Sequence, residues 1–109
     1  MSVVTIKNDE LTIGINTYGA ELTSVKDSNG KEYIWQGDEN VWKNQAPNLF
    51  PVVGRVTGGK YNFDGKTYEM KAHGFARNSE FEVEEASDNH VTFALFSNEE
   101  TKSICMNNV

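Results

Sequence analysis

The feature that most constrains the fold is a series of short segments in which apolar and polar residues alternate. Leu11, Ile13 and Ile15 would all point to one side of an extended chain, because successive side chains of a strand point to opposite faces. Segments of this kind recur about every 8–12 residues, and no apolar pattern favours a helix longer than a turn or two. The sequence therefore predicts an all-β fold of antiparallel strands, of the sandwich or barrel type.

Turn residues separate these segments and set their limits. Asp27-Ser28-Asn29-Gly30 and Asp64-Gly65 combine residues that tolerate the positive φ of tight hairpin turns. Asp38 is expected to begin a short helical turn over residues 38–43. Extended segments are predicted at residues 3–7, 11–16, 20–25, 31–35, 60–63, 66–70, 80–85 and 90–96.

Two longer segments, residues 36–59 and 71–79, show no clear period and interrupt the strands. The first contains both prolines and a short apolar run at residues 49–53, and this apolar content makes disorder the weaker interpretation. Loops that a β scaffold holds in place are where binding groups tend to lie. We therefore expect both segments to be ordered, functional loops.

The side chains best suited to binding and catalysis lie in these two segments. Arg55 offers a fixed fork of hydrogen-bond donors that suits hydroxyls or a phosphate, and His73 can donate, accept and titrate near neutral pH. Structural roles also account for them: Arg55 as a strand cap or a bridge between acidic side chains, His73 as a turn residue. Trp35 is predicted to lie in the core. Trp42 suits either the core or a platform for a sugar ring.

The charge of the chain argues against several classes of partner. Ten basic and sixteen acidic residues give a net charge of −6, which disfavours nucleic acid and anionic membrane surfaces. The N-terminus lacks a signal-peptide pattern and no apolar run approaches the roughly 18 residues of a membrane-spanning helix, so we expect a cytoplasmic location. The single cysteine, Cys105, has no partner for an internal disulfide, and we assign it no role. The two histidines and this cysteine show no metal-ligand spacing, so no metal is expected.

Several short motifs occur in a fixed order along the chain. They are Gly19-Ala20-Glu21-Leu22, Leu49-Phe50-Pro51, Gly54-Arg55, Gly59-Lys60-Tyr61, Asp64-Gly65-Lys66 and His73-Gly74-Phe75-Ala76-Arg77. Any one of them alone is a weak signal. Taken in this order, they make the chain resemble the aldose 1-epimerase (galactose mutarotase-like) family over roughly residues 3–100.

The resemblance implies a part of a galactose mutarotase-like β-supersandwich, with antiparallel strands and long functional loops. Residues 1–109 would be the N-terminal part of a single aldose 1-epimerase-like domain. Its C-terminal part, beginning with further strands after residue 101, would be absent. Uncovered sheet edges and an uncovered apolar face would then leave the chain marginally stable and prone to self-association.

The resemblance also implies an isomerase that interconverts the α and β anomers of a free hexose by acid–base ring opening, without a cofactor. Arg55 matches the arginine that contacts sugar hydroxyls. His73 matches the first active-site histidine, a catalytic and substrate-binding residue near the ring oxygen and C1. Arg77 looks like an arginine of the related hexose-6-phosphate epimerases, where a phosphate would be its partner. The family's second histidine and its glutamate base lie in the C-terminal part, so this chain alone is expected to be inactive.

Two other functions remain open at this point. One is a non-catalytic carbohydrate-binding module that keeps the arginine and the histidine but lacks the acid–base pair. The other is a hexose-6-phosphate 1-epimerase-like protein. In every case the expected partner is a small-molecule sugar, either a hexose or a hexose phosphate.

Overall fold

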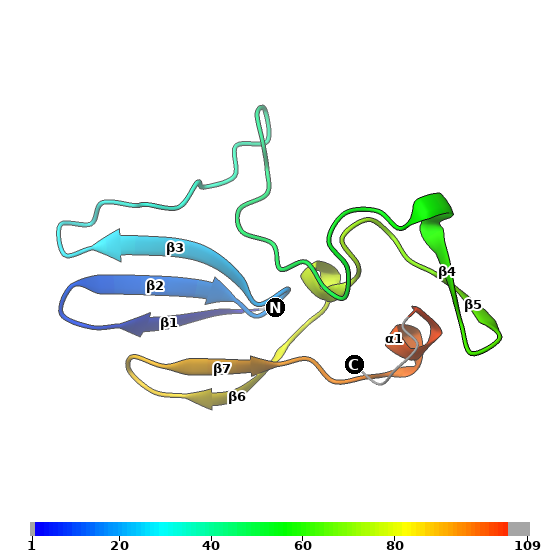
Figure 1. The fold of residues 1–109 in the computed structure, drawn as a ribbon. Coiled ribbons are helices and arrows are strands. Elements are labelled where there is room, and N and C mark those ends of the chain that lie inside the picture. The colour runs from blue at the N-terminus through cyan, green and yellow to red at the C-terminus, as the bar shows by residue number, and fades with distance from the viewer. Residues whose placement is uncertain (1, 105–109) are drawn as a thin grey trace.

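In the computed structural model, which describes residues 2–104, the chain forms three small antiparallel sheets (Figure 1). The first sheet has the order β1-β2-β3, and two separate hairpins pair β4 with β5 and β6 with β7. The prediction of an all-β fold with antiparallel strands is thereby confirmed. Cys105 lies outside the described residues. The strands are β1 (Val3–Lys7), β2 (Leu11–Asn16), β3 (Glu21–Asp27), β4 (Lys60–Phe63), β5 (Lys66–Glu69), β6 (Glu82–Ala86) and β7 (Val91–Ala94).

The prediction of a strand at residues 31–35 is wrong, because the backbone pairing with β3 is limited to residues 31–33, where the Asp27 N–H donates to the Lys31 carbonyl at 3.1 Å and the Tyr33 N–H to the Val25 carbonyl at 2.9 Å. The chain turns at Gly30 and forms a single bridge between Lys26 and Glu32. The Glu32 carboxylate then accepts hydrogen bonds from the Ser24 hydroxyl and from backbone N–H groups on both segments. These donors are the N–H groups of Val25 at 2.8 Å, Ile34 at 3.0 Å and Tyr33 at 3.1 Å.

The prediction that Trp35 lies in the core is also wrong, since its side chain is 48% exposed. Without a strand at this position, nothing turns the ring inward. Its indole N–H instead donates to the carbonyl of Trp42 at 2.5 Å. Trp42 is exposed as well, which excludes the core role left open for it. The helical turn expected from Asp38 is one hydrogen-bonded turn, closed by the Trp42 N–H on the Asp38 carbonyl at 2.8 Å.

A short helix, α1 (Glu99–Ile104), follows β7 near the end of the described chain. Reciprocal capping accounts for it: the Asn98 side chain accepts from the Thr101 N–H, and the Thr101 hydroxyl accepts from the Asn98 N–H, both at 2.8 Å. The Tyr61 hydroxyl of β4 donates to the carbonyl of Ile104 at 2.6 Å. Helix and hairpin are thus joined at one end of the molecule (Figure 1). Two 3-10 turns, Thr57–Gly59 and Ala76–Asn78, complete the described elements.

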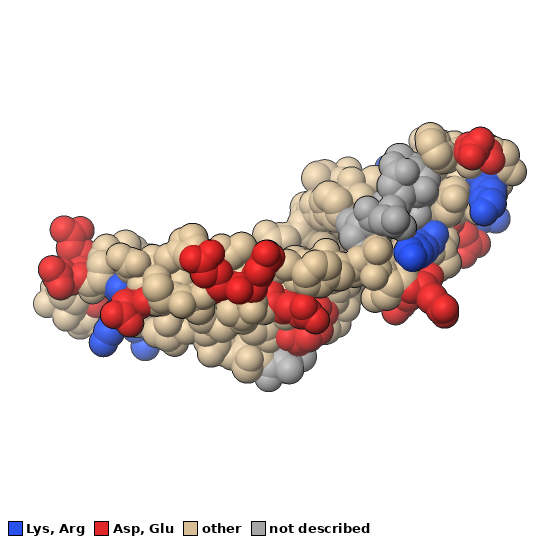
Figure 2. All heavy atoms as spheres, turned by 90° about the horizontal axis from the view of Figure 1, so that it is seen from below, with Lys and Arg blue, Asp and Glu red and all other residues tan. Residues whose placement is uncertain are grey.

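The core of the described chain is small. Among residues 2–104, only Met70 and Ala76 are buried hydrophobic residues, and no large side chain is fully buried. The radius of gyration is 16.6 Å, whereas a compact domain of about 100 residues has about 13 Å. Figure 2 shows the resulting long, thin body, which measures 55 × 35 × 19 Å along its principal axes.

Candidate functional site

The two irregular segments singled out in the sequence lie against each other through backbone hydrogen bonds. The Phe50 carbonyl accepts from the N–H of Phe75 at 2.9 Å and from that of Ala76 at 3.2 Å. Phe50 and Gly74 form a parallel bridge, and Gly74 has φ +74°. A Cβ atom at Gly74 would lie 2.1 Å from the Phe50 carbonyl oxygen, so only glycine allows this approach. We call this contact between the two loops the loop junction.

A second pair of hydrogen bonds holds His73 at the loop junction. The backbone N–H of His73 donates to the Gly54 carbonyl at 2.8 Å, and the ring Nδ1 of His73 accepts from the backbone N–H of Gly54 at 2.9 Å. Since Nδ1 is an acceptor, the neutral imidazole carries its hydrogen on Nε2, where it can be donated to a ligand. His73 also has φ +65°, in the left-handed region that costs a non-glycine residue about 1–2 kcal/mol. These hydrogen bonds therefore hold a half-buried histidine in a strained backbone conformation, in which the ring Nδ1 already accepts a hydrogen bond.

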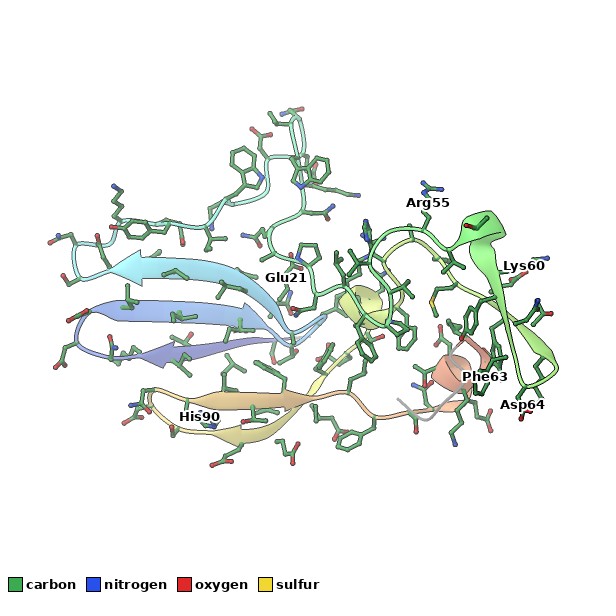
Figure 3. All side chains as sticks on the ribbon, viewed as in Figure 1. Glu21, Arg55, Lys60, Phe63, Asp64 and His90 are labelled. Carbon is green, nitrogen blue, oxygen red and sulfur yellow. The ribbon has the colours of Figure 1, made fainter. Side chains whose placement is uncertain are left out.

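Arg55 follows Gly54 directly, and its side chain projects away from the loop in Figure 3. It is exposed. Within residues 2–104 it has no ion pair or hydrogen bond, so the structural role of bridging acidic side chains is not seen. Its guanidinium is therefore available to a ligand.

Arg77 is held more tightly on the other loop. One of its terminal nitrogens donates to the Ala72 carbonyl at 3.3 Å. Its Nε is buried without a hydrogen-bond partner in the described part of the chain. A buried, unpaired donor on a charged group is costly, and binding an acceptor would remove that cost.

An open groove of about 610 Å³ lies beside the loop junction and contains both arginines. Three of its lining residues are cationic and none is acidic, although the chain as a whole carries a net charge of −6. His73 does not line this groove, but its backbone and ring bond to the residue before Arg55. The groove is lined by Arg55, Val56, Gly58, Gly59, Met70, Lys71, Ala72 and Arg77.

Two polar side chains anchor the first loop to the first sheet. The Glu21 carboxylate accepts from the N–H of Ala46 at 3.0 Å and of Gln45 at 3.3 Å (Figure 3). The Asn48 amide donates to the carbonyls of Gly19 and Ala20 at 2.9 and 2.8 Å. Sequence reasoning assigned no positioning role to Glu21, although it stands in the Gly19-Ala20-Glu21-Leu22 motif.

Three further findings concern the second histidine, metal binding and membrane crossing. His90 is exposed at the turn between β6 and β7, far from Arg55 in Figure 3, and its Nε2 lies 3.1 Å from the Thr92 hydroxyl. Residues 2–104 contain no group of three or more histidine, cysteine, aspartate or glutamate side chains placed to hold a metal ion. No helix in this range has the length and apolar character needed to cross a membrane.

Comparison with known proteins decides the family. The sequence profile of the aldose 1-epimerases matches residues 2–103. The chain belongs to the aldose 1-epimerase family. Its relatives include the plasmid-encoded protein LacX of Lactococcus lactis subsp. lactis, 39% identical over 102 residues. That match covers 89% of this chain and 34% of LacX.

Solved structures of two relatives show that this member of the aldose 1-epimerase family has a galactose mutarotase-like fold. A galactose mutarotase related enzyme from Lactobacillus acidophilus is 41% identical, with a TM-score of 0.94 over 98% of this chain and 36% of that one. A galactose mutarotase-like protein from Lactobacillus casei is 39% identical, with a TM-score of 0.92 over 98% of this chain and 37% of that one. The chain therefore spans about a third of the length of these relatives.

Proposed function

We propose that this chain provides the sugar-holding part of a 1-epimerase site, in which a hexose is interconverted between its α and β anomers. The observation that carries the proposal is the pairing of Gly54 with His73, because it fixes the histidine ring next to Arg55. In this proposal Arg55 and His73 bind the same sugar. Membership of the aldose 1-epimerase family supports it.

The chemistry assigns a role to each side chain. A base removes the proton of the C1 hydroxyl while an acid protonates the ring oxygen O5; the C1–O5 bond breaks and C1 becomes a carbonyl. After rotation about C1–C2, the ring closes on the other carbonyl face, with the proton transfers reversed. His73 Nε2 would donate to O5, and the Arg55 fork would hold neighbouring hydroxyls so that the reacting atoms stay aligned.

Ring opening needs a second proton-transfer group on the opposite side of the sugar. In residues 2–104, no carboxylate or second imidazole is hydrogen-bonded to His73 or Arg55. We therefore expect this chain to bind a hexose, and to accelerate anomer exchange only when another segment supplies the second group.

Binding can be tested with the chain as it is. Saturation-transfer NMR with α-glucose or α-galactose should detect binding that His73→Ala weakens at least about tenfold, as expected for a lost hydrogen bond to a buried partner. His90→Ala is the matched control, since His90 is exposed and remote. Equal weakening by both changes, or none by His73→Ala, would remove His73 from the site. Saturable binding without faster anomer exchange by polarimetry, even when another segment supplies the second proton-transfer group, would favour a non-catalytic carbohydrate-binding module.

The cationic groove favours a second candidate, a hexose phosphate in place of a free hexose. Arg55, Lys71 and Arg77 all line the groove, and the buried Nε of Arg77 has no described partner. A phosphate would supply several acceptor oxygens to these donors. Glucose 6-phosphate should then bind more tightly than glucose, with an advantage that falls as salt rises and is lost in Arg77→Ala. Equal affinity for both sugars would exclude this candidate.

A further inference from the structure

The turn that ends β3 presents an asparagine–glycine pair to solvent, and no other asparagine in the sequence precedes a glycine. The Gly30 N–H donates to the Asp27 carbonyl at 3.0 Å and closes the turn. Asn29 and Gly30 are both exposed, and apart from neighbouring residues no described atom lies within 4 Å of where a Cβ at Gly30 would be. The turn lies at the end of the first sheet, away from the loop junction (Figure 1). The atoms of this pair are therefore open to water.

The backbone of the turn is held, but the side chain of Asn29 is not. Oδ1 of Asp27 accepts from the N–H of Asn29 at 2.9 Å and from that of Lys31 at 3.0 Å. Within residues 2–104, the side-chain amide of Asn29 makes no hydrogen bond, so it can rotate toward the backbone nitrogen that follows it. Other asparagine side chains are occupied by bonds to the backbone, namely those of Asn8, Asn16, Asn48 and Asn98.

We infer that Asn29 is a site of self-modification by deamidation, in which the nitrogen of Gly30 is the nucleophile and water is the co-reactant. The Gly30 nitrogen bonds to Cγ of Asn29 as the Cγ–Nδ2 bond breaks. The proton of the Gly30 N–H passes through solvent to the departing nitrogen, which leaves as ammonia. One water then opens the cyclic imide. Breaking the new nitrogen–Cγ bond gives aspartate, and breaking the original peptide bond gives isoaspartate.

A second turn shows why the glycine matters. Asn40 is also exposed and its side-chain amide makes no hydrogen bond within residues 2–104. Its N–H donates to Oδ1 of Asp38 at 2.9 Å, and the N–H of Val41 donates to the Asp38 carbonyl at 3.0 Å. These bonds match those at Asn29, but the β-branched side chain of Val41 crowds its nitrogen, whereas glycine allows close approach. The two turns therefore differ mainly in access to the nucleophile.

The two products differ in their effect on the turn. Aspartate keeps the backbone and adds one negative charge. Isoaspartate places one more carbon in the main chain between Asp27 and Lys31, where the turn has no room for it because hydrogen bonds at both ends fix its length. The pairing beyond the turn, in which the Tyr33 N–H donates to the Val25 carbonyl at 2.9 Å, should loosen as a result.

The test is to incubate the folded chain at mildly alkaline pH and to follow its peptides by mass spectrometry. The peptide with Asn29 should gain the mass difference between water and ammonia at least about tenfold faster than the peptide with Asn40, because its nucleophile is uncrowded. Val41→Gly should raise the rate at Asn40 toward that at Asn29. Asp64-Gly65 could form the same imide only by losing water, which leaves its mass unchanged after hydrolysis. Exchange at the Tyr33 amide should accelerate in the isoaspartyl product and stay slow in Asn29→Asp.

Three results would overturn the inference. One is an equal rate at Asn29 and Asn40. Another is a rate at Asn40 that Val41→Gly leaves unchanged, because access to the nitrogen would then not govern the reaction. The third is deamidation of Asn29 in urea but not in the folded chain, which would show that the turn shields the pair.

Discussion

The loop junction is irregular but buried and hydrogen-bonded, whereas the hairpin of β6 and β7 is regular but has a fully exposed outer strand. At the junction Gly74 and Ala76 are buried, and Phe50, Gly54 and His73 are tied together by backbone and ring hydrogen bonds. In the hairpin every residue of β6 is exposed. The irregular part is thus the more tightly organised: hydrogen bonds between the two loops fix its geometry, whereas the outer strand of the hairpin faces solvent along its whole length.

The largest expected effect comes from breaking the loop junction. Gly74→Ala places a Cβ 2.1 Å from the Phe50 carbonyl oxygen at a residue with φ +74°, and we expect a cost of about 3 kcal/mol or more. Hydrogen exchange at the Phe75 and Ala76 amides should accelerate about 100-fold. Gly65→Ala is the matched control, since Gly65 has φ +77° but open space around it, and it should cost only about 1–2 kcal/mol. An unchanged Phe75 amide in Gly74→Ala would contradict the junction.

Removing the anchor between the loop and the first sheet should have a smaller effect. Glu21→Ala leaves the N–H groups of Gln45 and Ala46 without their acceptor, at a cost of about 1–3 kcal/mol. The Ala46 amide should exchange about tenfold faster or more, while the Phe75 amide stays protected. Glu85→Ala on the exposed strand should alter neither. Loss of protection at Phe75 would show that the junction depends on the sheet after all.

Acid should loosen the segment after β3 before it disturbs the loop junction. The hydrogen bond from Ser24, with those from the backbone N–H groups of Val25, Ile34 and Tyr33, lowers the pKa of Glu32 from 4.5 to about 2. Because the pKa is depressed in the folded chain, the stabilisation is complete above about pH 4.5 and is lost as the pH falls toward about 2. Tryptophan emission, to which Trp35 and Trp42 both contribute, should shift over this pH range, and the shift should be absent in Glu32→Gln. Glu39→Gln is the control and should retain the shift in tryptophan emission. If Glu32→Gln titrated in the same way as the unmodified chain, another group would be the cause of the shift.

The smallest effect on stability is expected at Arg55. Its side chain is exposed and has no partner among the described residues, so Arg55→Ala should change the free energy of unfolding by less than about 0.5 kcal/mol. Hexose affinity, measured by NMR titration, should nevertheless fall about tenfold or more, as for a lost charged hydrogen bond. Lys66→Ala removes an exposed cation from β5 and should leave both quantities unchanged. Unaltered affinity in Arg55→Ala would place the sugar elsewhere.

Much of the fold follows from local sequence patterns. The alternation of Leu11, Ile13 and Ile15 and the Asp64-Gly65 turn predict β2 and the β4–β5 hairpin, because period and turn chemistry act within a few residues. The strand predicted at 31–35 failed because backbone pairing stops at Tyr33 and the Glu32 carboxylate binds the N–H groups of Val25 and Ile34, which no periodicity reveals. The prediction that Trp35 lies in the core was wrong as well, since it assumed this strand.

The candidate site was predictable only in its components. Arg55, His73 and Arg77 stand out in the sequence as motif residues on two loops. Their arrangement depends on the carbonyl of Phe50 meeting the N–H of Phe75 and on the ring of His73 accepting from Gly54. Backbone contacts across some twenty residues leave no trace in composition or period. Their roles toward a sugar stay a prediction.

The contact between Phe50 and Gly74 has a consequence for the order in which the chain folds. The β1–β2, β4–β5 and β6–β7 pairs each join neighbouring strands through short turns, and closing such short loops loses little chain entropy. The contact between Phe50 and Gly74 encloses the whole β4–β5 hairpin. A hairpin that is already formed shortens the flexible chain between these two residues and so lowers the entropy cost of bringing them together. In a time-resolved exchange experiment the amides of β4 and β5 should therefore become protected before that of Phe75. The groove beside the loop junction would then be the last part of this region to take shape, after the β4–β5 hairpin that it borders.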